Sequence, residues 1–349
     1  MKSITTSMAY IGLAVQLFFT SCFNPSIDNL VNSYDYNKKE KQFVVSMQEE
    51  KGQQGLLKQA GNFLIENLDE LLEKYIENQH VNNEEKAKYP VREAIKRVPI
   101  LMYHEIGYPE ESSFSNRYVV TPDNFRKQLE FLNKNDYVPI SIDEYLKDDF
   151  SQIPEDKLPI ILTFDDATKG QFRYLEDKKI DPESAVGIMD DFAKEHDDWR
   201  QRASFFIDFV DRDGFFQVPF AQEEKEKDKI SYLQENGYEV YCHTMYHPSL
   251  ERVSFKDLLN DIRTFKYLVG QMDIEKSNII AVPYGAYPQI DKTWQFLDKN
   301  FDYYFAAYAR TRDKRAKRVN SEHFDNKYIP RIEVPPNNLS KLESYINGF

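Results

Sequence analysis

The chain has 349 residues, of which 41% are hydrophobic, so it can bury the core of one large domain with appendages or of two modest ones. It carries 45 Lys and Arg residues against 58 Asp and Glu residues, a formal net charge of -13 at pH 7. A surface this acidic repels a phosphate backbone, which argues against general nucleic-acid binding and favours small or neutral partners.

The first 21 residues have the arrangement of an export signal. Lys2 is followed by an apolar stretch from Met8 to Phe19, which is too short to span a membrane, and two small residues then precede Cys22. The arrangement resembles a bacterial lipoprotein signal. This resemblance implies a diacylated Cys22 that anchors an exported protein to a membrane of the cell envelope, on the periplasmic side or at the cell surface. Because Phe19 is unusual in such a signal, a plain secretory signal is the alternative.

Residues 22–97 are interpreted as a tether followed by an N-terminal helical extension. The segment 24–37 is polar and has little regular periodicity, which is typical of a tether. From Leu56 to Ile76 apolar residues recur at helical spacing, with acidic residues opposite, which predicts an amphipathic helix. Its apolar face either packs on the main domain or binds a partner.

From Val98 the pattern changes to strand, loop and helix in alternation, which predicts a parallel sheet with helices outside it. About eight strands suffice to close a (β/α) barrel, and we expect it over residues 98–349. Helices are expected to begin at Thr121 with Pro122, at Asp181 with Pro182, and at Ser254. The expected strands are 98–103, 137–140, 159–164, 204–207, 238–242, 278–282, 303–307 and 328–334.

The strand that begins at Leu158 ends on two acids, Asp165 and Asp166. Its nearly continuous apolar run suits a parallel strand covered on both faces. Sites in such folds are built at the carboxyl ends of the strands, so the two acids are candidate site residues. Taken alone, the pair is better explained as the cap of the next helix.

His243 and His247 stand four residues apart just after the strand that ends at Cys242, and so emerge at the same end of the barrel. Two imidazoles and a carboxylate can hold Zn²⁺ or a similar ion and leave coordination positions open for water and substrate. The combination with the strand-terminal acids is much more specific than either motif alone.

Three motifs, TFDD, HTMYHP and VPYG, together resemble those of the NodB-type polysaccharide deacetylases, carbohydrate esterase family 4. The resemblance covers residues 98–334. It implies a distorted (β/α) barrel and a divalent metal, Zn²⁺ with Co²⁺, Ni²⁺ or Mn²⁺ as alternatives, that serves to remove acetyl groups from N-acetylated sugars. By position, Asp165 is the implied general base, and the implied metal ligands are Asp166, His243 and His247.

The VPYG motif implies an oxyanion and substrate-binding site at Pro283 and Tyr284, in which the backbone N–H of Tyr284 helps to hold the oxyanion. The motif departs from the family pattern at Ala281, where an Arg that pairs with the base is usual. Arg331, on the last expected strand, is the candidate replacement. A second departure is Ala167, which stands where Gly is usual.

The late histidine that usually serves as the catalytic acid is also missing, since after His247 only His323 remains. The segment LMYHEIG on the first strand resembles the branch of the family that acts on poly-N-acetylglucosamine, in which the acid histidine is supplied in circularly permuted order. First and last strands are neighbours in a closed barrel, so His104 is assigned as the acid. The alternative is a packed or helix-capping histidine.

The leading hypothesis is therefore an exported, membrane-anchored and metal-dependent enzyme that deacetylates an N-acetylglucosamine-containing polymer of the extracellular space or cell wall. O-acetyl ester cleavage is a close variant. The alternative is a catalytically impaired, polysaccharide-binding surface lipoprotein, which Ala167, Ala281 and the missing late histidine favour. A third hypothesis is an adhesin or scaffold built on the helix from Leu56 to Ile76.

Overall fold

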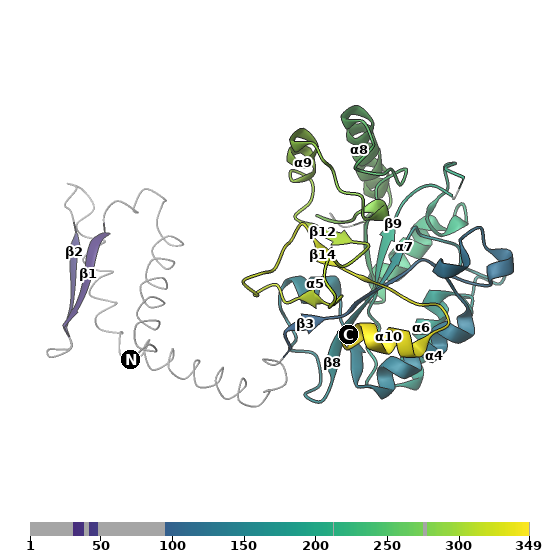
Figure 1. Ribbon diagram of the computed structural model, residues 1–349, viewed down its shortest axis with the longest axis horizontal. Coiled ribbons are helices and arrows are strands. Elements are labelled where there is room, and N and C mark those ends of the chain that lie inside the picture. The colour runs from purple at the N-terminus through teal and green to yellow at the C-terminus, as the bar shows by residue number, and fades with distance from the viewer. Residues whose placement is uncertain (1–30, 38–41, 48–94, 212, 275–277, 349) are drawn as a thin grey trace. The chain divides into compact units, whose positions relative to one another are not determined.

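The computed structural model describes residues 31–37, 42–47, 95–211, 213–274 and 278–348 (Figure 1). The chain divides into two compact units, Met1–Glu85 and Lys86–Phe349. The export signal, Cys22 and the expected helix over 56–76 lie outside the described residues. None of the helices that the structure describes is long and apolar enough to cross a membrane.

In the first unit, β1 (Val31–Asn37) and β2 (Gln42–Met47) form an antiparallel pair. The first of these strands lies within the segment that the sequence analysis interpreted as a tether. The two segments, VNSYDYN and QFVVSM, contain Val, Tyr and Phe, which favour strands.

The second unit is built on a sheet of parallel strands in the order β14, β12, β11, β10, β9, β8, β4, β15, with β7 paired to β8 off this path. These strands coincide with the eight expected ones, the last of which is split in two. Their bounds are β4 (Ile100–Tyr103), β7 (Tyr137–Pro139), β8 (Leu158–Asp165), β9 (Ser204–Ile207), β10 (Glu239–Cys242), β11 (Ile279–Ala281), β12 (Tyr303–Ala306), β14 (Ile329–Pro330) and β15 (Ile332–Glu333).

The two ends of this sheet are one stretch of chain interrupted at Arg331. On one side β14 pairs with β12, and on the other side β15 pairs with β4. The sheet therefore curls into a nearly closed barrel, as the sequence predicts. Arg331 lies at the point where the barrel closes.

Alternate side chains of the strands belong to two different apolar clusters. Leu162, Phe205 and Ile280 pack with the surrounding helices. Ile161 and Phe206, with Ala281, belong to a second cluster. Because successive side chains point to opposite faces of a strand, the second cluster fills the barrel interior.

Two smaller sheets pair β3 (Arg97–Val98) with β13 (Ala316–Lys317), and β5 (Glu105–Ile106) with β6 (Val119–Val120).

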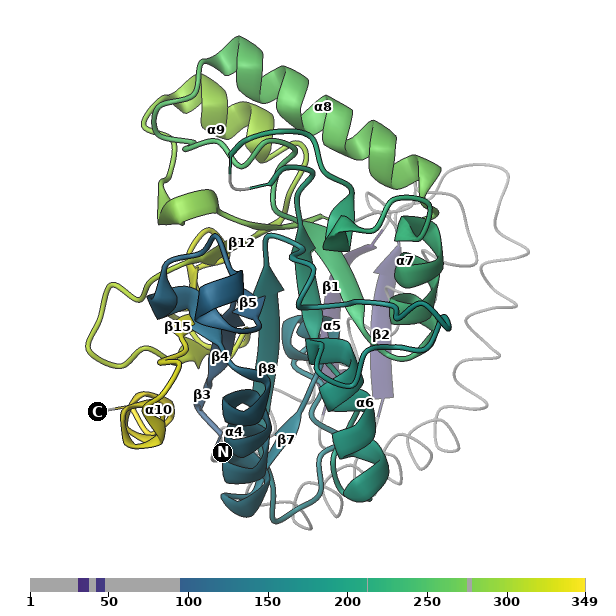
Figure 2. The same cartoon turned by 90° about the vertical axis from the view of Figure 1, so that its right-hand side faces the viewer.

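Helices cover the outside of the barrel, and α4 (Pro122–Lys134) and α6 (Ala185–Glu195) lie side by side over it (Figure 2). The helices are α4 (Pro122–Lys134), α5 (Ile142–Leu146), α6 (Ala185–Glu195), α7 (Glu226–Glu235), α8 (Phe255–Gln271), α9 (Asp291–Leu297) and α10 (Leu339–Ile346).

Two of the three predicted helix starts are confirmed, since Thr121 caps α4 and Ser254 caps α8 through their side-chain oxygens. The third was wrong by three residues. Asp181 instead forms an ion pair with Arg173, and Ser184 is the residue that caps α6. Oδ1 of Asp181 still accepts the N–H of Glu183 at 2.9 Å, and its carbonyl accepts the N–H and the hydroxyl of Ser184, so Asp181 forms the turn that leads into the helix and not its cap.

Candidate active site

The predicted site residues meet at the carboxyl end of the barrel. His104 follows β4, Asp165 ends β8 and precedes Asp166, His243 follows β10, and Tyr284 lies shortly after β11. The strands are parallel and neighbours in the sheet, so their carboxyl ends form one rigid edge. The fold thus brings together residues that are up to 180 positions apart in the chain.

Asp166, His243 and His247 form a compact trio. The Nε2 atoms of the two imidazoles are 3.1 Å apart, and each is 3.3 Å from Oδ1 of Asp166. An ion that binds each atom at about 2.0–2.1 Å in tetrahedral geometry separates its ligands by about 3.3 Å. The donor set and the spacing therefore fit a single divalent metal ion.

Neighbouring groups orient the His243 ring and keep Asp166 ionised, and both effects favour the binding of a cation. Nδ1 of His243 lies 3.0 Å from the carbonyl oxygen of Ala281, and an Nδ1–H that donates there leaves Nε2 as a lone pair facing the trio. Burial raises the pKa of the Asp166 carboxyl, but the His243 hydrogen bond and the nearby imidazole charges outweigh it and hold the pKa well below its usual range. Asp166 is therefore an anion at neutral pH.

Asp165 lies beside the trio in a buried ion pair. Its two oxygens accept hydrogen bonds from Nη1 and Nη2 of Arg331, at 2.6 and 2.7 Å, and both side chains are almost fully buried. Burial raises the pKa of the Asp165 carboxyl. The guanidinium of Arg331 and the charge of His243 lower this pKa by more than burial raises it, so the pKa lies below its usual value. Oδ2 of Asp165 is 3.8 Å from Nε2 of His243, so the ion pair adjoins the metal ligands.

Arg331 contacts Asp165, as the sequence analysis proposed. Its Nη1 also donates to Oγ1 of Thr163, its Nε donates to the carbonyl of Ala306, and its guanidinium lies 5.1 Å from the ring centre of Phe206. Ala281 belongs to the same interior cluster as Phe206. A small residue at 281 leaves interior space for an arginine that arrives from the closing strand.

Backbone strain marks the same three motifs. Asp166, Ala167, Thr244, His247 and Tyr284 all have φ between 42° and 72°, the left-handed region that favours glycine. Each costs about 1–2 kcal/mol relative to an ordinary conformation. Ala167 shows why the family usually has Gly here: the chain must turn through this region directly after the two acids.

His104 borders the two acids from β4. Its ring lies 4.7 Å from that of Tyr118, and its positive charge, when protonated, lowers the pKa of both Asp165 and Asp166. Gln171 fixes the backbone between them, because its Nε2 donates to the carbonyls of His104 and Asp165, both at 2.5 Å. Sequence reasoning missed Gln171, since it belongs to none of the three motifs.

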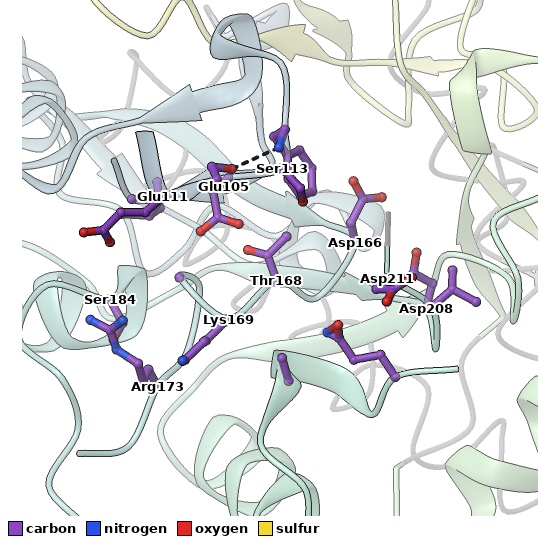
Figure 3. A pocket seen from close by; sticks show the side chains of 18 of the residues that line it. Glu105, Glu111, Ser113, Asp166, Thr168, Lys169, Arg173, Ser184, Asp208 and Asp211 are labelled. Carbon is purple, nitrogen blue, oxygen red and sulfur yellow. Dashed lines mark hydrogen bonds between the residues drawn. The ribbon is translucent and has the colours of Figure 1, made fainter. Parts of the chain in front are cut away.

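A cavity of about 710 Å³ adjoins the trio, and Asp166 is among the residues that line it (Figure 3). His247 and the exposed rings of Tyr246 and Tyr284 line it as well. The Tyr284 ring packs edge-on against His247, with 4.4 Å between ring centres. The lining residues that no sequence motif indicated include Glu105, Glu111, Ser113, Thr168, Lys169, Arg173, Ser184, Asp208 and Asp211.

Residues 152–299 match the family model for polysaccharide deacetylase. This segment is a polysaccharide deacetylase domain. It carries the paired acids and both imidazoles of the trio, while His104 and Arg331 lie outside the matched residues. The chain is accordingly a hydrolase of the deacetylase class. A comparison with curated proteins gives no match.

Solved structures share the fold of the deacetylase domain. The Streptococcus pyogenes deacetylase PplD, solved with acetate, is 23% identical, with a TM-score of 0.52 over 72% of this chain and 98% of that one. The polysaccharide deacetylase BC0361 of Bacillus cereus is 18% identical, with a TM-score of 0.52 over 72% and 69%. The de-N-acetylase of Aggregatibacter actinomycetemcomitans is 13% identical, with a TM-score of 0.50 over 71% and 99%.

Proposed function

We propose that the deacetylase is metal-dependent and removes acetyl groups from N-acetylglucosamine residues of an extracellular or cell-wall polysaccharide. The observation that carries the proposal is the trio of Asp166, His243 and His247 beside the buried Asp165–Arg331 pair, adjoining an open cavity. A metal-ligand set and an adjacent ionised base are what amide hydrolysis at neutral pH requires.

Two imidazoles and one carboxylate are the donors of hydrolytic zinc sites, so Zn²⁺ is the proposed resident ion, with Co²⁺, Ni²⁺ and Mn²⁺ as alternatives. Asp166, His243 and His247 would hold it. A divalent cation supplies polarisation of the acetyl carbonyl and acidification of a water molecule.

The chain's own residues supply the proton transfers. Asp165, kept ionised and oriented by Arg331, accepts a proton from the attacking water. The N–H of Tyr284, with Pro283 beside it, stabilises the developing oxyanion. His104 donates a proton to the departing sugar nitrogen, so that the C–N bond breaks and acetate and a free amine are released.

The Arg331–Asp165 contact bears on the alternative of a binding-only protein. Ala281 was one of the three departures that favoured that alternative, since without a cationic partner a buried Asp165 would take up a proton and could not act as a base. Arg331 supplies the cation from another strand. Turnover is therefore favoured over binding alone.

We further propose that the protein is exported and anchored to a membrane of the bacterial envelope through a lipid on Cys22. The support is the signal-like sequence of residues 1–21. A lipid anchor would hold the deacetylase domain near the glycans of the envelope.

Acetate release from metal-loaded protein tests the activity. N-acetylglucosamine oligomers, peptidoglycan and an O-acetylated glycan serve as parallel substrates, so that the polymer and the bond are distinguished. Release should stop with a chelator and return with added Zn²⁺. Glycan binding by metal-loaded protein with no acetate from any substrate would instead establish the binding-only alternative.

A further inference from the structure

Asp261, on α8, binds the loop that carries both imidazoles, although it belongs to none of the motifs. Its Oδ1 accepts a hydrogen bond from the backbone N–H of Met245, and its Oδ2 accepts one from that of Tyr246, both at 2.9 Å. The side chain is buried, and the residue is 2% exposed. One carboxylate thus holds the two consecutive amides that precede His247.

The loop needs such a restraint because its backbone is strained. Thr244 and His247 have φ of 71° and 49°. A β-branched residue such as Thr is a rare occupant of this region, so an unrestrained loop would relax toward ordinary dihedral angles. The opposite side of the loop is also tied down, since the N–H of Phe209 donates to the carbonyl of Met245 at 3.1 Å.

We propose that Asp261 is a positioning residue for the metal centre, holding the Met245 and Tyr246 amides so that His243 and His247 keep their Nε2 atoms together. The proposal rests on the proposed metal-dependent function. Loss of the carboxylate would leave the Met245 and Tyr246 N–H groups without this acceptor and would allow the strained loop to relax. The imidazoles would then no longer be preorganised, although both would remain in the chain.

The test compares the dissociation constants of Zn²⁺ and Co²⁺ for wild-type protein and Asp261→Asn. The amide of Asn can accept only one of the two hydrogen bonds and turns an N–H₂ group toward the other amide. We expect metal binding to weaken about 10–100-fold, the usual effect of removing a group that orients a ligand, and the visible spectrum of bound Co²⁺ to change. Burial raises the pKa of Asp261 to about 6, so titrations at about pH 8 keep it ionised.

Asp190→Asn is the matched control. Asp190 is also a buried carboxylate that accepts hydrogen bonds, from Gln201, Tyr232 and Tyr238, but it lies on α6 and does not contact the loop. Its substitution should lower the unfolding temperature and leave metal affinity unchanged. A second variant, Asp261→Glu, keeps the charge and displaces the carboxylate; weaker metal binding in this variant separates positioning from simple attraction of a cation.

The outcomes are distinct. If Asp261→Asn and Asp261→Glu bind metal as tightly as wild-type protein, the role of Asp261 is refuted while the metal-dependent function stands. If Asp190→Asn weakens binding as much as Asp261→Asn, the effect is general destabilisation and the positioning role is also refuted. If wild-type protein binds no metal ion, both proposals fail together.

Discussion

The two halves of the site are built in opposite ways. The trio of Asp166, His243 and His247 comes from two short motifs. Two of its members, Asp166 and His247, line the cavity and have left-handed backbone conformations. The Asp165–Arg331 pair joins residues 166 positions apart, lies in the barrel interior, and is held by ordinary strand geometry. The first half depends on loop geometry and the second on barrel closure.

This difference has a physical meaning. Metal ligands must face an open coordination position, so they lie on loops whose conformation has to be imposed by other groups. A buried ion pair must exclude water and satisfy its remaining donors, so it lies inside the barrel, where Thr163 and the Ala306 carbonyl complete the contacts of Arg331. Substitutions in the two halves should consequently fail in different ways.

The largest effect is expected in the metal half. His243→Ala should lose both metal and turnover, since the trio then keeps one imidazole and one carboxylate. Asp165→Asn should lower turnover by roughly 10³-fold or more, because the proton acceptor is lost, while metal content stays at the wild-type level, because all three residues of the trio remain. Metal analysis of purified protein alongside acetate release checks both. Metal loss in Asp165→Asn would contradict the assignment of Asp165 as the base.

The second largest effect is expected for His104, which lies beside both Asp165 and Asp166. His104→Gln should lower turnover about 10²–10⁴-fold without changing metal affinity, because the departing amine loses its proton donor. His323→Gln is the control, since His323 is exposed and its hydrogen bonds with Lys317 and Ser321 are made by its backbone groups. Kinetics of both variants at saturating metal provide the measurement. The reverse ranking would transfer the acid role to His323.

In the buried half, Arg331→Met should cost about 3–5 kcal/mol of unfolding free energy in metal-free protein, because it leaves the Asp165 charge buried without a partner. Denaturant unfolding measures this, and the double variant with Asp165→Asn should recover part of the loss. Arg117→Met is the matched control: its pair with Glu333 is also bidentate but exposed, and should be worth about 0–1 kcal/mol. Equal costs for the two arginines would show that burial does not govern the Asp165 pair.

Sequence predicted most of the barrel because its strands are short apolar runs bounded by loops, and every expected strand is present. It also indicated the candidate metal ligands, since the spacing of His243 and His247 and the strand-terminal position of Asp166 are visible in the sequence. Arg331 could be proposed only after Ala281 had shown that a partner was missing. Its contact with Asp165 depends on which strands become neighbours when the barrel closes.

Gln171 and Asp261 could not be proposed in the same way. Both act through backbone groups of other residues, and a backbone amide or carbonyl carries no sequence signature. The late start of α6 has a related cause. Asp181 is a good helix cap by composition, and only the structure reveals that its side chain accepts the N–H of Glu183 in the turn before the helix, which leaves Ser184 as the cap.

The smallest effect is expected for Thr163, whose hydroxyl helps to orient Arg331 without changing the charge of the buried pair. Oγ1 of Thr163 donates to the carbonyl of Leu101 at 2.7 Å and accepts from Nη1 of Arg331 at 3.3 Å. Thr163→Val keeps the shape and removes both contacts, so we expect a loss of about 1 kcal/mol and only a small change in turnover.

Ser204→Ala is the control for Thr163→Val. Its buried hydroxyl, on β9, donates to Glu239 and not to the pair, so it should cost similar stability with turnover unchanged. Unfolding and acetate-release measurements on both variants separate the two contributions. If Thr163→Val abolished turnover, the two hydrogen bonds to Asp165 would not be enough to orient Arg331, and the Thr163 hydroxyl would be needed to position the catalytic base.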